Sequence, residues 1–447
     1  MSILLRARSA RACSSQRLVH GAAFAAAWIL FSALPGAARA QPNVSLADSL
    51  RIAVERSKKV AAQDASITAI KEMGVAAGQL PDPVLKLGLD NVPADGPDRF
   101  SVARDFMTMR RIGVMQEITR SDKRKLKTER YEREAERAAA EKSAAIAVLQ
   151  KDTALAWLDR YYLERMRAVV ASQAQEANLE IQSAESAYRA GRGSQVDVYA
   201  ARGSRVALDD RLSELDRRIR NARTMLARWI GEAADASLTG TPDISKVAVA
   251  SHSLEQDIVA HPEIAMLAKQ VAVAQTETQL ARANKQADWS VELAYQERGS
   301  AFSNMFSVGV SVPLQWDQKN RQDREIAAKS ALAQQALAQQ EEMVRAHVAE
   351  IRSMLAEWEN GRERVARYER ELVPLAKDRT EAALAAYRGG KSDLASVLSA
   401  RRNEIDVRTQ TLQLEMETAR IWAQLNYLLP DEAHGGQDNH ASTGDVK

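Results

Sequence analysis

The side chains with the clearest chemical potential in this chain of 447 residues occur in two similar segments. The segments start at Tyr188 and Tyr387, an offset of 387 − 188 = 199 residues. Each combines a tyrosine, a glycine and a serine/aspartate pair at matching positions: Tyr188, Gly191, Ser194 and Asp197, then Tyr387, Gly390, Asp393 and Ser396. Carboxylates attract cations, and this is the chemistry that these residues could do. A repeat of this length indicates that one large unit was doubled, so we expect a function shared between the halves rather than one catalytic pocket.

Other kinds of chemistry have little support in the sequence. No activated nucleophile, phosphate-binding loop or pair of catalytic carboxylates stands out, so we expect no enzyme activity and no cofactor. Five of the six histidines lie after the first forty residues and are scattered along the chain: His252, His261, His347, His434 and His440. Because no two of them stand at the spacing of metal ligands on a helix, we expect exposed or packed histidines and no metal site. Met107 and Met109 could bind a soft ion such as copper(I), but an ordinary loop or strand edge is favoured.

The first forty residues have the features of an export signal. Several arginines precede an apolar run over residues 21–34, and Ala38-Arg39-Ala40 offers small residues for cleavage. This pattern predicts a secretory signal peptide over residues 1–40. Without the five arginines of this leader the chain has 57 basic and 59 acidic residues, a balance of −2 that gives no case for nucleic-acid binding. The only cysteine, Cys13, lies in the leader, so we expect no disulfide, thiolate metal site or lipid anchor.

The distribution of proline predicts long helices. No proline occurs between Pro97 and Pro242, which permits helices over residues 121–188 and 194–230. Apolar residues in the second of these recur in steps of four and three: Leu208, Leu212, Leu215, Ile219, Ala222, Leu226 and Trp229. Shifted by 199 residues, five of these seven positions are again apolar, and a similar apolar seam runs from Val344 to Leu375. We therefore expect coiled-coil packing in both halves, with the longest helix about 100 Å long.

Short segments between the helices alternate apolar and polar residues, as half-buried strands do. They lie near residues 84–91, 111–118, 289–297 and 304–314. The alternation suits either a transmembrane β-barrel or a soluble sheet packed on helices. The predicted signal peptide and the absence of any other core favour the barrel. No stretch after the leader reaches the roughly 18 apolar residues of a spanning helix, so entry into a membrane would be as a barrel. Four strands cannot close a barrel, which needs about eight, so we expect either two copies with eight strands or three with twelve.

The predicted organisation follows from these segments. Each half is expected to run helix, strand, strand, helix, helix, with the first repeat over residues 41–240 and the second over residues 241–430. Residues 431–447 are polar and glycine-containing, and we expect them to be a disordered tail. The predicted fold class is mainly α, with a duplicated unit of long helices and a small membrane β-barrel.

The whole pattern resembles the TolC-like outer-membrane factors, the outer-membrane channels of tripartite efflux systems. The resemblance rests on the duplicated unit and on the motif Tyr-x-x-Gly-x-x-Ser-x-x-Asp-Val at residues 188–198, with its second copy from Tyr387. It implies a homotrimer in which the long helices form a coiled-coil α-barrel and four strands per protomer form one shared twelve-stranded β-barrel. The implied location is the outer membrane of a Gram-negative bacterium, in contact with its lipid and extending into the periplasm. The implied partners are a periplasmic adaptor (membrane fusion) protein and an inner-membrane pump of the resistance-nodulation-division type.

Two stretches resemble one branch of that family. Residues 80–83, Leu-Pro-Asp-Pro, and residues 107–117 are similar to the heavy-metal efflux branch, which implies export of heavy-metal cations. A type I secretion exit duct with the same architecture is the nearest alternative. A periplasmic coiled-coil scaffold that never enters the membrane is the alternative from another class.

Within this resemblance, the two repeated segments form the periplasmic tip and gate. The acidic ring of the family falls here on Ser396 and Ser399, so Asp197 or Asp393 is the available substitute, and Arg401 and Arg402 bring positive charge nearby. We hypothesise that one of these carboxylates supplies a ring of charge at the entrance.

Ordinary structural roles are expected for other residues of the segments. Gly191 and Gly390 suit tight reversals between helices, and Tyr188 and Tyr387 precede those reversals. Ser194 is expected to cap the returning helix of the first repeat, with Ser392 or Asp393 as the cap in the second.

Overall fold

The structure is a computed structural model that describes residues 43–247, 258 and 261–427. The predicted signal peptide and the predicted tail over residues 431–447 lie outside the described residues, all of which belong to the unit Asn43–Lys447. Among the helices of the described residues, none combines the length and the apolar character needed to cross a membrane.

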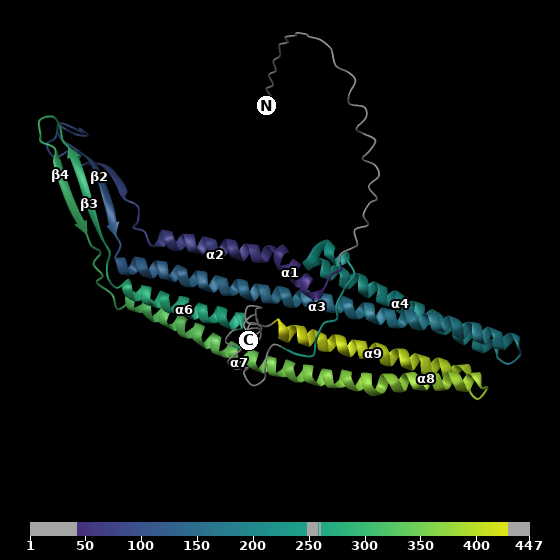
Figure 1. Cartoon of the computed structure of the whole chain (residues 1–447). Helices are drawn as coiled ribbons and strands as arrows, with labels where there is room; N and C mark the ends of the chain where they lie inside the picture. The colour runs from purple at the N-terminus through teal and green to yellow at the C-terminus, as the bar shows by residue number, and fades with distance from the viewer. Residues whose placement is uncertain (1–42, 248–257, 259–260, 428–447) are drawn as a thin grey trace, which may run out of the picture. The chain divides into compact units, whose positions relative to one another are not determined.

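Helices dominate both repeats, and each repeat contributes two strands (Figure 1). The elements of the first repeat are α1 (Leu46–Arg56), α2 (Lys58–Ala77), β1 (Val84–Asp90), β2 (Met109–Ile118), α3 (Ser121–Arg189), α4 (Gln195–Ile230) and the short 3-10 helix η1 (Gly231–Asp235). Those of the second are α6 (Pro262–Ala283), β3 (Trp289–Glu297), β4 (Met305–Ser311), α7 (Gln322–Arg367), the π-helical turn η3 (Tyr368–Leu372), α8 (Val373–Arg388) and α9 (Leu394–Asn426). The prediction of a mainly α chain with four short strands is confirmed.

Helix α3 is the longest element and extends along most of the others. Its 69 residues confirm the long helix predicted from the absence of proline and correspond to a length of about 100 Å. Helices α1, α2, α4, α6 and α9 all pack against it. The largest buried side chains lie near its middle, where Trp157, Leu158 and Val170 are 1% exposed or less.

The predicted heptad seam of α4 faces the core. Leu208, Leu215, Ala222 and Leu226 are buried, and the two other seam residues between them, Leu212 and Ile219, are partly buried against the same core. In α9 the shifted positions behave in the same way, since Leu414 and Leu425 are buried. Coiled-coil spacing therefore describes the helix that ends each repeat.

The second-repeat seam is interrupted where a continuous one was expected. Leu372 and Leu375 belong to the predicted seam but are 37% and 65% exposed. The helix changes to a π-helical turn at Tyr368–Leu372, in which the N–H of Val373 donates to the carbonyl of Tyr368. Pro374 follows at once and has no N–H to donate, so the regular hydrogen-bond pattern cannot continue through this point. The extra residue of the π turn shifts the residues after it to another face of the helix.

The segment between the repeats is fixed by two tryptophans. The indole N–H of Trp358 on α7 donates to the carbonyl of Ile244 at 3.2 Å, and that of Trp422 on α9 donates to Lys246 at 2.7 Å. The last described residues of this connection are therefore held against the second repeat.

The four strands form one antiparallel sheet in the order β1-β2-β3-β4. The central pair, β2 and β3, joins the two repeats, with Gly113 opposite Ala294. The sheet and the turn between α3 and α4 lie at opposite ends of α3, because β2 leads into its first residue and the turn follows its last (Figure 1).

We predict that Gly361→Ala destabilises the packing of α7 on α9. A Cβ at Gly361 would lie 2.5 Å from Oγ1 of Thr418, a side chain that is 1% exposed and hydrogen-bonded to Leu414. Overpacking of this kind costs about 1–3 kcal/mol. The matched control is Gly203→Ala in α4, where a Cβ meets nothing within 4 Å and the gain in helix propensity is up to about 1 kcal/mol. Thermal unfolding of the two purified variants and the wild type measures both effects. A melting temperature of Gly361→Ala equal to that of the wild type would contradict the predicted close contact.

Candidate functional site

One face of the sheet is a continuous apolar surface. Residues paired across antiparallel strands lie on the same face, and the register links Leu85 to Val114, Val114 to Leu293 and Leu293 to Val308. The four side chains are 61%, 48%, 53% and 73% exposed, respectively. A second row on this face consists of Leu87, Ile112, Tyr295 and Phe306.

The opposite face of the sheet is polar and contains ion pairs. Lys86 and Glu292 are 2.6 Å apart, and Arg111 lies 3.4 Å from Asp90 and 3.7 Å from Glu292. This face also carries Gly113, Ala294 and Ser307, together with the apolar side chains of Val84, Met115 and Met305 nearer the strand ends. The two faces therefore differ in chemistry over the full width of the sheet.

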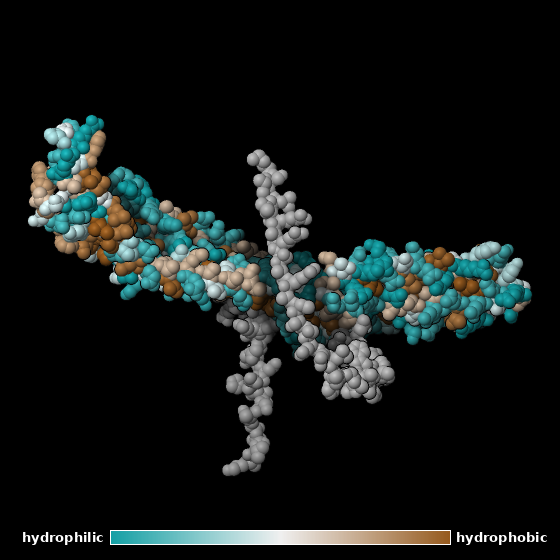
Figure 2. All heavy atoms as spheres, turned by 90° about the horizontal axis from the view of Figure 1, so that it is seen from above, coloured by the Kyte–Doolittle hydropathy of each residue, from teal (hydrophilic) through white to brown (hydrophobic). Residues whose placement is uncertain are grey.

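The exposed apolar face bears on whether the strands belong to a transmembrane β-barrel or to a soluble sheet packed on helices. A soluble sheet packed on helices would bury its apolar face. Over the part of the chain that the structure describes, this face is instead open, and Figure 2 shows apolar residues gathered over the end of the unit that carries the strands. An open apolar surface of this kind marks a site of contact with lipid or with another protein.

Exposed aromatic residues flank the sheet at both ends. Trp289 and Trp316, 41% and 86% exposed, stand at the end that joins the helices. Phe100 and Phe106, 65% and 56% exposed, lie in the connection between β1 and β2 at the other end. Aromatic residues in two bands are typical of the boundaries between lipid and water.

The first of the two repeated segments forms the turn from α3 to α4. Gly191 has a φ of +70°, a conformation that glycine adopts without strain, and the N–H groups of the next two residues donate to the carbonyl of Ala187. Ser194 is the N-cap of α4, and its Oγ accepts the N–H of Asp197 at 3.2 Å. The Asp197 carboxylate accepts the N–H of Ser194 at 2.9 Å, which completes a capping box.

The second segment forms the equivalent turn from α8 to α9. Gly390 has a φ of +68°, and the N–H of Lys391 donates to the carbonyl of Ala386 at 2.9 Å. Asp393, rather than Ser392, is the N-cap, and its Oδ1 accepts the N–H of Ser396 at 2.9 Å and the hydroxyl at 2.5 Å. These hydrogen bonds from Ser396 lower the pKa of Asp393, so the carboxylate is charged at neutral pH.

The two turns thus use the same pair of residue types in exchanged positions. Serine is the cap and aspartate the third helical residue in the first turn, whereas the order is reversed in the second. Both carboxylates have a structural role at a helix N-terminus; Asp393 is exposed and Asp197 is half-buried.

The two turns pack on each other through a small apolar group, the tip cluster. It consists of Ala184, Val198, Ala201, Leu394, Val397 and Leu398. Tyr387 is half-buried against this cluster, whereas Tyr188 is 49% exposed. Burial, followed by the charge of Asp197, raises the pKa of Tyr387. A cavity of about 620 Å³ lies between the turns, lined among others by Arg192, Tyr387 and Gly390.

Ion pairs join α3 to α9 above the tip cluster. Arg401 contacts the carboxylates of Glu180, at 3.0 Å, and Glu176. Further along, Arg165 pairs with Glu415 at 2.9 Å, and Arg420 lies 2.7 Å from Asp159. Arg401 therefore connects the two repeats within one chain, whereas Arg402 is exposed.

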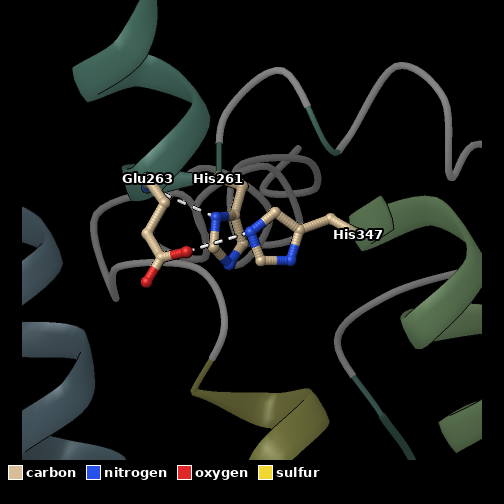
Figure 3. Close-up of side chains that lie close together, drawn as sticks. All are labelled: His261, Glu263 and His347. Atoms are coloured by element: carbon tan, nitrogen blue, oxygen red, sulfur yellow. Dashed lines mark hydrogen bonds and ion pairs between the residues drawn. The ribbon is translucent and has the colours of Figure 1, made fainter. Parts of the chain in front are cut away.

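The structure brings together one cluster of side chains that the spacing of the histidines does not predict. His261 and His347, predicted to be separate exposed or packed histidines, have ring centroids 4.5 Å apart, and Glu263 lies beside them (Figure 3). Burial, and then the nearby His347, lower the pKa of His261 to about 4, so this ring is neutral at neutral pH. The separation of 347 − 261 = 86 residues gives no local signal, because the packing of α6 on α7 brings the rings together.

The two methionines considered as soft ligands are not in the same environment. Met107 lies in the connection between β1 and β2 and is 48% exposed, and Met109 is the first residue of β2. Thr108 between them is buried and donates its hydroxyl to the carbonyl of Asn91 at 2.9 Å. The segment is the start of a strand held by its loop.

No family model and no curated protein matches the sequence. Solved structures do match: the outer-membrane channel OprN has a TM-score of 0.72 at 19% identity, over 86% of this chain and 90% of that one. CusC, studied for the conformational changes that accompany folding and transmembrane channel formation, has a TM-score of 0.72 at 13% identity, over 86% and 92%. The outer membrane protein VceC from Vibrio cholerae has a TM-score of 0.69 at 16% identity, over 86% and 95%. This chain therefore has the TolC-like fold that the resemblance implied.

Proposed function

We propose that this protein is a passive exit channel in the outer membrane of a Gram-negative bacterium, with no catalytic chemistry of its own. The observation that carries the proposal is the exposed apolar face of the sheet, which spans all four strands and has an ion-paired polar face behind it. Lipid would contact the apolar face and water the polar one. The TolC-like fold and the flanking aromatic residues support the same assignment.

The sheet also supports a closed oligomer. β1 and β4 are its edges, and each pairs with one neighbour only in the protomer. In a ring, β1 of one copy would meet β4 of the next in antiparallel orientation, which removes every open edge. Three copies give twelve strands, enough for a barrel with an open lumen. We therefore propose a homotrimer with one shared barrel.

The helical turns are proposed to form the periplasmic entrance. They lie at the opposite end of α3 from the sheet, about 100 Å away along the helix. The cavity between the turns is lined by polar side chains, including Ser186, Arg192 and Arg388. We propose that it seats a periplasmic adaptor, which would connect the channel to an inner-membrane pump.

The proposed cargo is heavy-metal cations. The support is the similarity of residues 80–83 and 107–117 to the heavy-metal efflux branch. The half-buried carboxylate of Asp197 and the exposed carboxylate of Asp393 lie at the turns and are consistent with a path that attracts cations.

The lipid-facing assignment of the sheet predicts opposite results for two neighbouring positions. Val308→Arg puts a charge on the apolar face, where arginine costs about 2–4 kcal/mol at the middle of a bilayer. Ser307→Arg is the matched control, because its side chain belongs to the polar face. We expect Val308→Arg to lose assembled, heat-modifiable protein from the outer-membrane fraction and Ser307→Arg to keep it. Normal assembly of Val308→Arg would refute the membrane assignment.

The proposed charge ring predicts the effect of removing both carboxylates. The double variant Asp197→Asn and Asp393→Asn keeps side chains that cap helices well and removes the charge. We expect the concentration of a trivalent cation that blocks the single-channel current to rise by about tenfold or more. The reason is that focused fields enrich counter-ions by at least about tenfold.

The control for this experiment is Ser194→Ala. It removes a cap hydroxyl, worth about 1 kcal/mol of helix stability, and leaves both carboxylates in place. Block should then stay at the wild-type level. If the double asparagine variant is blocked as easily as the wild type, the two carboxylates do not form the ring.

The cargo is tested in the host cell. We expect deletion of the gene to lower the tolerated concentration of one or more divalent transition metals, and the Ser307→Arg protein to restore it. Sensitivity to organic compounds alone would overturn the metal cargo and leave the channel proposal intact.

A further inference from the structure

We propose that His261, Glu263 and His347 form a binding site for one divalent transition-metal ion of the zinc type. The site would join the start of α6 to the middle of α7, in a part of the fold that the exit-channel proposal does not use. It is independent of which cargo the channel conducts.

The three side chains are already gathered around one point. One ligand atom from each residue lies within 4.8 Å of the others. Nε2 of His347 is 2.9 Å from Oε2 of Glu263, and Figure 3 shows this carboxylate and this ring pointing toward each other. Donors around a tetrahedral zinc ion are about 3.3 Å apart, given bonds of about 2.0–2.1 Å. Small side-chain adjustments would therefore complete the coordination.

The position of His261 is set by the helix it begins. It is the N-cap of α6, is 6% exposed and is followed by Pro262 at the first helical position. Its Nδ1 accepts the N–H of Glu263 at 3.3 Å, a long and therefore weak bond. Coordination through Nδ1 would replace that bond, and coordination through Nε2 would move the ring proton to Nδ1. Either choice exchanges a weak contact for a metal bond.

His347 has the outer partner that metal-binding histidines usually have. Its Nδ1 lies 3.5 Å from Oε2 of Glu350, one turn along α7. A proton on Nδ1 directed at this carboxylate leaves the lone pair of Nε2 facing Glu263. Without a metal, a proton on Nε2 would make the 2.9 Å contact a hydrogen bond to Glu263, and a metal ion would take the place of that proton.

The surroundings leave room for an ion and a bound water. The cluster borders a cavity of about 290 Å³, whose lining includes Ala147 and Lys151 of α3 and Tyr427. The carboxylates of Glu263 and Glu350 outnumber the one ammonium group of Lys151 at this cavity. Two imidazoles and one carboxylate suit zinc, cobalt, nickel or copper rather than magnesium or calcium, which prefer oxygen ligands alone.

The test is zinc binding to the purified full-length protein, freed of metal and titrated with Zn²⁺ alone by calorimetry. We expect one ion per chain. His347→Ala and Glu263→Gln should each weaken binding at least about 10- to 100-fold, the loss caused even by removing an outer partner of a ligand. Glu350→Gln should cause a smaller loss. The control combines His434→Ala with His440→Ala, two histidines that are not among the proposed ligands, and should bind as the wild type does.

Two further measurements separate binding from folding. Each variant is compared with the wild type by circular dichroism and thermal unfolding without metal, and His347→Asn, which keeps a polar side chain of similar size, replaces His347→Ala if that variant unfolds. Co²⁺ added to the wild type should give the visible absorption of a tetrahedral site, and His347→Asn should lack it. The proposal is overturned if folded cluster variants bind Zn²⁺ as tightly as the wild type, or if the control pair abolishes binding.

Discussion

The fold depends on the packing of other helices along α3, because a helix of 69 residues has no interior of its own. Helices α2 and α6 pack along its first half, as the pair between Lys269 and Glu136 shows, and α4 and α9 along its second half. The buried residues change accordingly: alanines near residues 135–147 allow close helix packing, whereas Trp157, Leu158 and Tyr162 fill a wider core at the middle. The first half of α3 therefore carries the sheet, and the second half positions the turns.

The contact between α3 and α9 joins the two repeats near the turns, as β2 with β3 and α3 with α6 join them nearer the sheet. Apolar packing alone would let long helices slide, since a heptad seam offers similar positions at each turn. Ion pairs at three levels, through Arg401, Arg165 and Arg420, match only one alignment of the two helices. Two of the acidic partners are buried, and burial together with the nearby Glu369 raises the pKa of Glu415, although Arg165 acts in the opposite direction. Pairs of this kind fix alignment more than they add stability.

The sequence predicts the elements better than it predicts their contacts. Proline spacing and apolar period locate α3, α4 and the four strands, because these signals depend only on neighbours in the chain. The π turn before Pro374 was not predicted, because the spacing of apolar residues continues through it although the α-helical hydrogen-bond pattern does not. The histidine cluster depends on the alignment of α6 with α7, and the single apolar face depends on strand register. Neither is a local property.

The continuous helix α3 also links the sheet to the turns. A continuous helix is a stiff spacer. If the sheet lies in lipid, α3 would therefore hold the turn at its other end about 100 Å from the sheet, with no flexible point between them. The second repeat lacks such a spacer, because its helix is interrupted at the π turn between α7 and α8. Its turn also has the half-buried tyrosine, whereas the tyrosine of the first turn is exposed. The duplicated halves are thus unequal in stiffness, and any opening of the turns would be expected on the side of α8, where the hydrogen-bond pattern is already irregular.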